Sequence, residues 1–183
     1  MGNRLSKIYT RTGDSGTTRL ADGEQVAKFD PRIIAGGDVD ELNCALGLLH
    51  AEGGVPDDLR ELVGAIQQSL FELGGEITMP EYQTIDEQSI SFLEDALDRL
   101  NSELPPLTEF ILPQGNRAVA TCHMARAVCR RAERSLWLLA DSGPIRTQLP
   151  RFLNRLSDFL FVVARSLAAR SDLTETQWQH ERR

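Results

Sequence analysis

A run of glycines, hydroxyl side chains and one carboxylate, TRTGDSGTT, occupies residues 10–18, ahead of any helical pattern. Gly13 and Gly16 permit positive φ angles, at which consecutive amides can point into one concavity and bind an anion. The threonines add hydroxyl donors, and Lys28 adds a positive charge further along the chain. This chemistry suits a polyphosphate, although the GK[ST] ending of a Walker loop is missing. A solvated turn with a helix-capping Asp14 explains the same residues equally well.

A second group of candidate residues lies on the segment ARAVCRRAERSLWLL, residues 125–139. At about 100° per residue, Arg126, Arg130 and Glu133 fall on one narrow stripe of a helix, beside a stripe of small apolar residues. Glu133 can pair with Arg130, but one carboxylate cannot neutralise the cluster. The surplus charge therefore calls for an anion, or for a carboxylate from another helix or another subunit. The alternative is a solvated arginine face, the usual outcome for a run of charges.

The segment LPRFLNRLSDFLFVVAR, residues 149–165, supplies a third group. Asn154 and Asp158 are i,i+4 neighbours beside a strong apolar stripe. An asparagine there can offer donors and an acceptor to adenine, ribose or phosphate, but a polar clip between helices is the commoner role of such a pair. The histidines are scattered without metal-ligand spacing, so we expect no metal held by protein side chains.

Helices must position all of these residues, because apolar residues recur at spacings of three and four along most of the chain. The pattern predicts one helix between Gly36–Gly37 and Gly53–Gly54, and others at roughly 57–78, 86–104, 116–141 and 148–171. Strand signals are weak. The sequence therefore predicts an all-α fold, a five-helix bundle with a long N-terminal loop, as a single domain over residues 1–183.

Two local features refine this prediction at the ends of helices. Thr84, followed three residues later by Glu87, predicts a capping box in front of the third helix. The tail, residues 172–183, has no periodic apolar face, and we expect it to be mobile.

The composition is that of a globular protein, with 41% hydrophobic and 26% charged residues. The net charge of -7 argues against broad nucleic-acid or membrane binding, which requires a large basic field. Cys44, Cys122 and Cys129 lie on helix-like segments without CxxC spacing, so we expect reduced, buried thiols. The first residues lack an apolar run and no segment approaches about 18 apolar residues, so we expect a soluble, cytoplasmic protein.

Five segments, in order and over most of the chain, resemble the PduO-type ATP:cob(I)alamin adenosyltransferases, also called corrinoid adenosyltransferases. They are KIYTRTGDSGTT, VDELN, FILP, RAVCRRAER and LNRLSDFLF. The resemblance implies a cobalamin adenosyltransferase-like bundle that forms a homotrimer with ATP at its subunit interfaces. It also implies transfer of the 5′-deoxyadenosyl group of ATP to reduced cobalt, giving adenosylcobalamin and triphosphate, with Mg²⁺ sharing the phosphate charge.

The same resemblance assigns roles to individual residues. In the nucleotide-binding loop region, residues 1–30, and on the later helices it implies ATP contacts from Thr10, Arg11, Thr12, Gly13, Thr18, Lys28, Arg130, Glu133, Arg134 and Asn154. It implies an interface salt bridge between Asp40 and Arg126, and an aromatic Phe110 below the corrin ring. Arg130 and Phe110 are thereby the candidate catalytic residues. Where the family commonly has small residues after FILP, this chain has Gln114-Gly115-Asn116, a departure that bears on corrinoid affinity.

Two other functions fit the same fold. An adenosylcobalamin carrier or chaperone would deliver the product to a dependent enzyme, and an ATP-binding sensor would bind the nucleotide without turnover. A flavoprotein reductase and an adenosylcobalamin-dependent enzyme are the protein partners that the resemblance suggests, and we expect no nucleic acid and no membrane among the partners.

Overall fold

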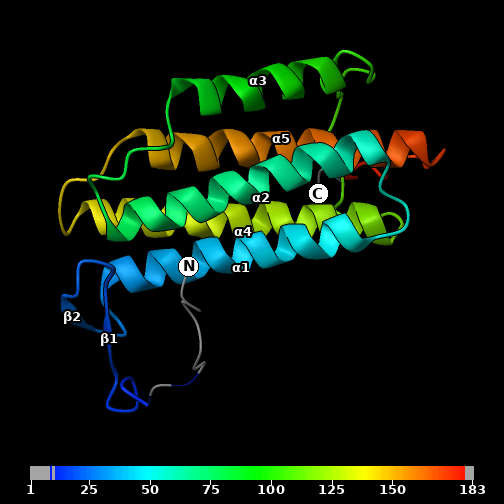
Figure 1. The fold of residues 1–183 in the computed structure, drawn as a ribbon. Coiled ribbons are helices and arrows are strands. Elements are labelled where there is room, and N and C mark those ends of the chain that lie inside the picture. Colours follow the sequence, from blue (N-terminus) through cyan, green and yellow to red (C-terminus); the bar gives the residue numbers. More distant parts are fainter. Residues whose placement is uncertain (1–8, 10, 180–183) are drawn as a thin grey trace.

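The computed structural model describes residue 9 and residues 11–179, so Thr10 lies outside the described residues. Five helices run side by side and form the bundle that the sequence predicts (Figure 1). They are α1 (Pro31–Ala51), α2 (Asp57–Thr78), α3 (Glu87–Asn101), α4 (Arg117–Ala140) and α5 (Gln148–Arg170). Helix α4 packs against α1 and α5, while α2 covers α1 and α3 covers α5. None of the helices in the described ranges is both long and apolar enough to span a membrane.

Helix α1 begins at Pro31, well before the predicted start after Gly36–Gly37. The Asp30 side chain caps it by accepting a hydrogen bond from the Arg32 amide at 2.9 Å, and Pro31 has the fixed φ that suits a first helical position. A glycine inside a helix costs about 1 kcal/mol relative to alanine. Burial of Ala35 and Val39 against the bundle offsets that cost, so the helix runs through both glycines.

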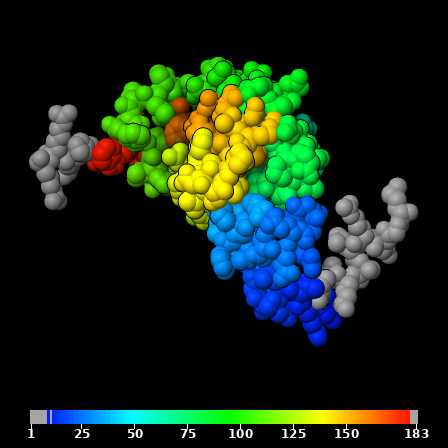
Figure 2. Space-filling view, turned by 90° about the vertical axis from the view of Figure 1, so that its left-hand side faces the viewer, coloured from blue at the N-terminus to red at the C-terminus, as the bar shows by residue number. Residues whose placement is uncertain are grey.

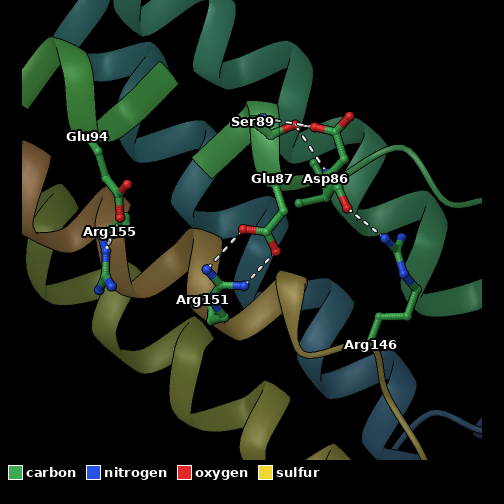
Figure 3. A network of polar contacts seen from close by, with 8 residues as sticks. Asp86, Glu87, Ser89, Glu94, Arg146, Arg151 and Arg155 are labelled. Carbon is green, nitrogen blue, oxygen red and sulfur yellow. Dashed lines mark hydrogen bonds and ion pairs between the residues drawn. The ribbon is translucent and has the colours of Figure 1, made fainter. Parts of the chain in front are cut away.

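The capping box of α3 is formed by Asp86 and Ser89, so the predicted Thr84–Glu87 pair is wrong. The Asp86 carboxylate accepts from the Ser89 amide at 2.9 Å, and the Asp86 amide donates to the Ser89 hydroxyl at 3.3 Å (Figure 3). The Ser89 amide and the Ser89 hydroxyl both donate to the Asp86 carboxylate, and they hold the pKa of Asp86 below its usual value. Glu87 instead reaches across to Arg151 on α5.

The long loop before α1 contains a small hairpin that the weak strand signals did not predict. Strand β1 (Thr17–Arg19) pairs antiparallel with β2 (Gln25–Ala27), with Thr18 opposite Val26. Three residues per strand are too few to give a visible alternation of apolar and polar residues. Viewed along the bundle, this dark-blue region projects from the body of the molecule (Figure 2).

Two of the three thiols are buried in the seam between α4 and α5, as predicted. Cys122 donates to the Leu160 carbonyl at 3.2 Å and Cys129 to the Leu153 carbonyl at 3.1 Å. Burial raises the pKa of Cys122 to about 12 and also raises that of Cys129. Cys44 is exposed, so the prediction of burial is wrong for it. It lies about 200° around α1 from Leu42, which faces the core.

The tail differs from the mobile segment that the sequence predicts, since residues 172–179 are attached to the connection between α3 and α4. The Leu112 amide donates to the Thr176 carbonyl at 2.8 Å, and the Trp178 amide donates to the Phe110 carbonyl at 2.7 Å. The buried Arg165 joins both segments to α5, because it donates to Glu175 at 2.9 Å and to the Pro105 carbonyl at 2.8 Å.

A buried ion pair fastens the end of the bundle where α2 finishes and α5 begins. The side chain of Glu76 is 1% exposed, pairs with Arg146, and accepts from the Thr84 and Ile85 amides at 3.3 Å. Arg146 also donates to the Ile85 carbonyl at 3.0 Å (Figure 3). One carboxylate on α2 therefore holds two connections, the one between α2 and α3 and the one between α4 and α5.

The substitution Arg146→Met should lower the free energy of unfolding by about 3–5 kcal/mol, because it leaves a buried carboxylate without its cation. Urea unfolding at pH 7 and one protein concentration measures this loss. Arg170→Met is the matched control: its pair with Asp58 is partly exposed and should contribute less than about 1 kcal/mol. Equal losses in the two variants would contradict the prediction, and Glu76→Gln should recover stability in the Arg146→Met background.

Candidate functional site

The amino-terminal loop brings Gly13 and Lys28 together. A Cβ atom added to Gly13 would lie 3.1 Å from both Cε and Nζ of Lys28 and 3.3 Å from the Thr17 carbonyl, so a side chain here would push against the lysine. Gly16, with φ of 82°, donates to the Gly13 carbonyl at 3.2 Å and accepts from the Lys28 amide at 2.9 Å. Within the described ranges no carboxylate pairs with Lys28, so its charge is available to an anion.

The remaining loop residues are more spread out. Arg11 has a positive φ of 60°, and its guanidinium lies 5.5 Å from the centre of the Tyr9 ring. Thr12 is exposed, and Thr18 is half-buried in the hairpin opposite Val26.

Helix α4 carries the arginine stripe, and neighbouring helices neutralise only part of it. Arg131 pairs with Asp38 at 3.2 Å and with Glu41, both on α1, and these carboxylates raise the pKa of Arg131. Arg130 is exposed and has no ion pair among the residues that the structure describes. Arg134 donates to the Arg130 carbonyl at 3.1 Å. The cationic surplus that the sequence predicts therefore centres on Arg130.

Glu133 does not pair with Arg130, although the spacing permits it. Its Oε1 accepts from the Asn154 amide of α5 at 3.2 Å. Asp158 is exposed, and the Asn154 amide nitrogen bonds to Glu133 instead, so the polar clip joins Asn154 to α4. The structure thus brings Glu133 and Asn154 together beside Arg130.

Arg126 and Asp40 do not form an ion pair with each other within the described part of one chain. The Nε of Arg126 is buried without a hydrogen-bond partner, whereas Asp40 is exposed on α1. Arg126 makes no ion pair within the described part of the chain. A buried guanidinium nitrogen without a partner is costly, so this position favours an acceptor from outside the described residues.

Phe110 belongs to the connection between α3 and α4, which lies at the end of the bundle opposite the hairpin (Figure 1). It is 76% exposed, and the Trp178 ring lies edge-on to it with the ring centres 6.4 Å apart. Trp178 is not among the predicted site residues; the signal that could have found it is an aromatic residue within a mostly polar tail.

The departure Gln114-Gly115-Asn116 has a structural role. Asn116 caps α4 by accepting from the Val119 amide at 3.0 Å, and it donates to the Ser171 hydroxyl at 3.1 Å. Gly115 has φ of 155°, and a Cβ there would lie 2.9 Å from a methyl group of Val119. These residues therefore start α4 and connect it to the end of α5.

A cavity of about 570 Å³ lies beside the Glu76–Arg146 pair. None of the site residues that the sequence predicts lines it. Its arginines are already neutralised, Arg32 by Asp30 and Glu24 and Arg146 by Glu76. Its charges therefore offer little to an ionic ligand.

The loop and Phe110 lie at opposite ends of the bundle, separated by the length of α1 (Figure 1). At 1.5 Å per residue, a helix of 21 residues spans about 30 Å. A site that uses both must take them from different chains.

The unpaired cations Lys28 and Arg130 suit a polyphosphate, and the exposed ring of Phe110 suits a flat apolar ligand. A helical bundle with both features belongs to a class of proteins that bring a nucleotide to a second, larger substrate. The chain belongs to the cobalamin adenosyltransferase family, whose model matches residues 8–167.

Known relatives agree with this assignment along the whole chain. The cobalamin adenosyltransferase of Cupriavidus metallidurans is 50% identical over 182 residues, with 100% of this chain and 99% of the relative covered. A corrinoid adenosyltransferase of Mycobacterium leprae is 41% identical, with 90% and 93% covered. A phenylalanine-to-histidine variant of the PduO-type ATP:corrinoid adenosyltransferase from Lactobacillus reuteri, complexed with cobalamin and ATP, matches with a TM-score of 0.90 at 32% identity, covering 94% of this chain and 97% of that one. The family and the fold that the sequence predicts are thereby confirmed.

His123 lies one turn before Arg126 and offers a test of the packing around it. It is buried, its Nδ1 has no partner, and its ring centre is 6.3 Å from that of Phe161. Burial, and then the nearby Arg126 charge, lower the pKa of His123.

The lowered pKa predicts a loss of stability in acid that depends on His123. Below pH of about 6.5 the unfolded chain takes up a proton that the folded chain does not, so the free energy of unfolding falls by up to about 1.4 kcal/mol per pH unit. Urea unfolding from pH 7.5 to 5.5 should show a steeper fall for the wild type than for His123→Leu. Parallel curves for the two proteins would show that the buried imidazole does not cause the acid sensitivity.

Proposed function

We propose that the chain transfers the 5′-deoxyadenosyl group of ATP to the cobalt of cob(I)alamin, giving adenosylcobalamin and triphosphate, at sites formed between subunits of a homotrimer. The names of the relatives and the ATP and cobalamin complexes of the L. reuteri enzyme support the reaction. In this chain the main support for the proposal is the unpaired guanidinium of Arg130. It has no carboxylate partner in the described residues, because the neighbouring Glu133 is held by Asn154.

In this reaction the protein aligns the substrates and stabilises the departing triphosphate. Reduced cobalt is itself a strong nucleophile, so no serine, cysteine or histidine base is required. Lys28 over Gly13 and the unpaired Arg130 supply fixed positive charge where the leaving group develops negative charge. Mg²⁺ fits as an ion bound through the phosphates, since no cluster of His, Cys, Asp or Glu in the described residues could hold a metal.

Phe110 has a different role in the proposal. Its exposed ring offers an apolar surface to the corrin, held in place by the hydrogen bonds of residues 110 and 112 to the tail. An apolar group under the corrin excludes water and the lower axial ligand, which makes cobalt easier to reduce. Because Gln114-Gly115-Asn116 serves to cap α4, the departure from the family pattern gives no support to a sensor without turnover.

The subunit arrangement is supported by three features of the single chain. The loop and Phe110 are a helix length apart, and the buried Nε of Arg126 lacks a partner while Asp40 is exposed. In addition, α1 and α4 expose large apolar side chains of the kind that mark subunit contacts, namely Ile34, Leu48, Met124, Trp137 and Leu138. We also propose a cytoplasmic location, which the free thiols Cys122 and Cys129 support.

The reaction is tested anaerobically with purified protein, MgATP and chemically reduced cobalamin, followed by the visible spectrum. The adenosylcobalamin spectrum should appear only with ATP. Arg130→Ala should slow its appearance by about 10²–10³-fold, the usual effect of removing one preorganised charge contact. Arg99→Ala, an exposed arginine of α3 outside the site, is the control. Wild-type rates in Arg130→Ala would refute the role of Arg130, while retained product without turnover would favour a carrier.

The interface pair is tested by exchanging charges. Asp40→Arg and Arg126→Asp should each reduce the oligomer, because like charges then face each other between subunits, and the double variant should restore it. Sedimentation velocity measures the mass, which for the wild type should be three times the 20.4 kDa of the chain. Single variants that remain fully assembled would exclude this pair from the interface.

A further inference from the structure

A line of polar contacts runs from α3 through Arg155 to the candidate nucleotide site. The Nε of Arg155 donates to Glu94 on α3 at 2.7 Å (Figure 3). Its Nη1 donates to the Oδ1 of Asn154 at 2.7 Å. The Nδ2 of Asn154 in turn donates to Glu133 on α4 at 3.2 Å. These contacts join three helices, and they end one helical turn from Arg130.

The chemistry of each group fixes the orientation of the next. A guanidinium only donates and a carboxylate only accepts, so the Asn154 amide must turn its oxygen toward Arg155 and its nitrogen toward Glu133. Without Arg155 the Asn154 amide would keep only its hydrogen bond to Glu133, and nothing would hold its oxygen end in place. Glu133 could then exchange this single, loosely held partner for Arg130, three residues earlier on the same helix face.

We propose that Arg155, held by Glu94, is a positioning residue: it orients the Asn154 amide, which keeps Glu133 away from Arg130 and leaves the Arg130 charge available to the phosphates of ATP. This inference rests on the proposed function, because it assumes that Arg130 binds the triphosphate.

The exposure of the pair argues against a mainly stabilising role. The Arg155 and Glu94 side chains are 37% and 44% exposed, and ion pairs at such exposure contribute at most about 1 kcal/mol. A second pair provides the comparison. One turn earlier on α5, Arg151 binds Glu87 of α3 at 2.6 and 3.1 Å, with similar exposure (Figure 3). Among the residues that the structure describes, Arg151 forms no hydrogen bond or ion pair with a candidate site residue, whereas Arg155 also bonds to Asn154.

The experiment compares Arg155→Met with Arg151→Met in the full chain, using the dissociation constant of MgATP by calorimetry and the KM values for ATP and cobalamin. Arg155→Met should weaken ATP binding about ten- to hundred-fold, the usual effect of disturbing hydrogen bonds to charged groups. The KM for cobalamin and the unfolding temperature should match those of Arg151→Met. Arg151→Met itself should bind ATP like the wild type.

A second substitution tests the route through Glu133. In the Arg155→Met background, Glu133→Gln should strengthen ATP binding, because it removes the carboxylate that has moved onto Arg130. In the wild-type background the same change should not strengthen it. The effect of Glu133→Gln on ATP affinity should therefore depend on whether Arg155 is present. A purely structural role of Arg155 would not produce this coupling.

The outcomes distinguish a failure of the proposed function from a failure of the role of Arg155 alone. Wild-type protein that binds no ATP would overturn the proposed function and this inference together. Wild-type binding with equal ATP affinity in Arg155→Met and Arg151→Met would overturn the inference alone, as would an Arg155→Met variant whose affinity Glu133→Gln does not improve.

Discussion

Ion pairing between helices decides which arginines of this molecule remain available to a ligand. Carboxylates from neighbouring segments neutralise most of the arginines that face the bundle: α1 supplies those of Arg131, α2 that of Arg146, and the tail that of Arg165. Arg126 and Arg130 have no such partner in the described residues. An acidic chain of net charge -7 thus keeps a local cationic surface, because no carboxylate of the described residues pairs with these two arginines. The bundle geometry matters for function chiefly through this distribution of charge.

The loop and Phe110 add a second constraint, which is distance. A rigid helix keeps them about 30 Å apart in one chain, and no side-chain movement can close such a gap. The proposed assembly resolves this separation, because the end of one bundle can approach the flank of another. The nucleotide and the corrinoid would then bind to surfaces that do not exist in a single subunit. Assembly and activity are therefore linked by geometry in the proposal.

Much of the fold could be predicted from the sequence, because five apolar stripes are long enough to show their period. The start of α1 was missed because two glycines resemble a boundary, and only packing against α4 shows that the helix continues through them. The stripe of Arg126, Arg130 and Glu133 also followed from periodicity. The partners of these residues could not be predicted from periodicity. Whether Glu133 binds Arg130 or Asn154 depends on the register between α4 and α5. That register is a property of the packed core, and it also places Arg155 against Glu94.

The pairing of the tail with the Phe110 connection has a consequence for how the protein is made. Leu112 and Thr176 are far apart in the chain, and all of α4 and α5 lies between them. During translation the helices can pack as they leave the ribosome, but the Phe110 connection must wait for residues that emerge after α5. The surface offered to the corrin is therefore a late product of folding, because it needs residues that are made after α5. A nascent chain would acquire its helical core before it acquires that surface.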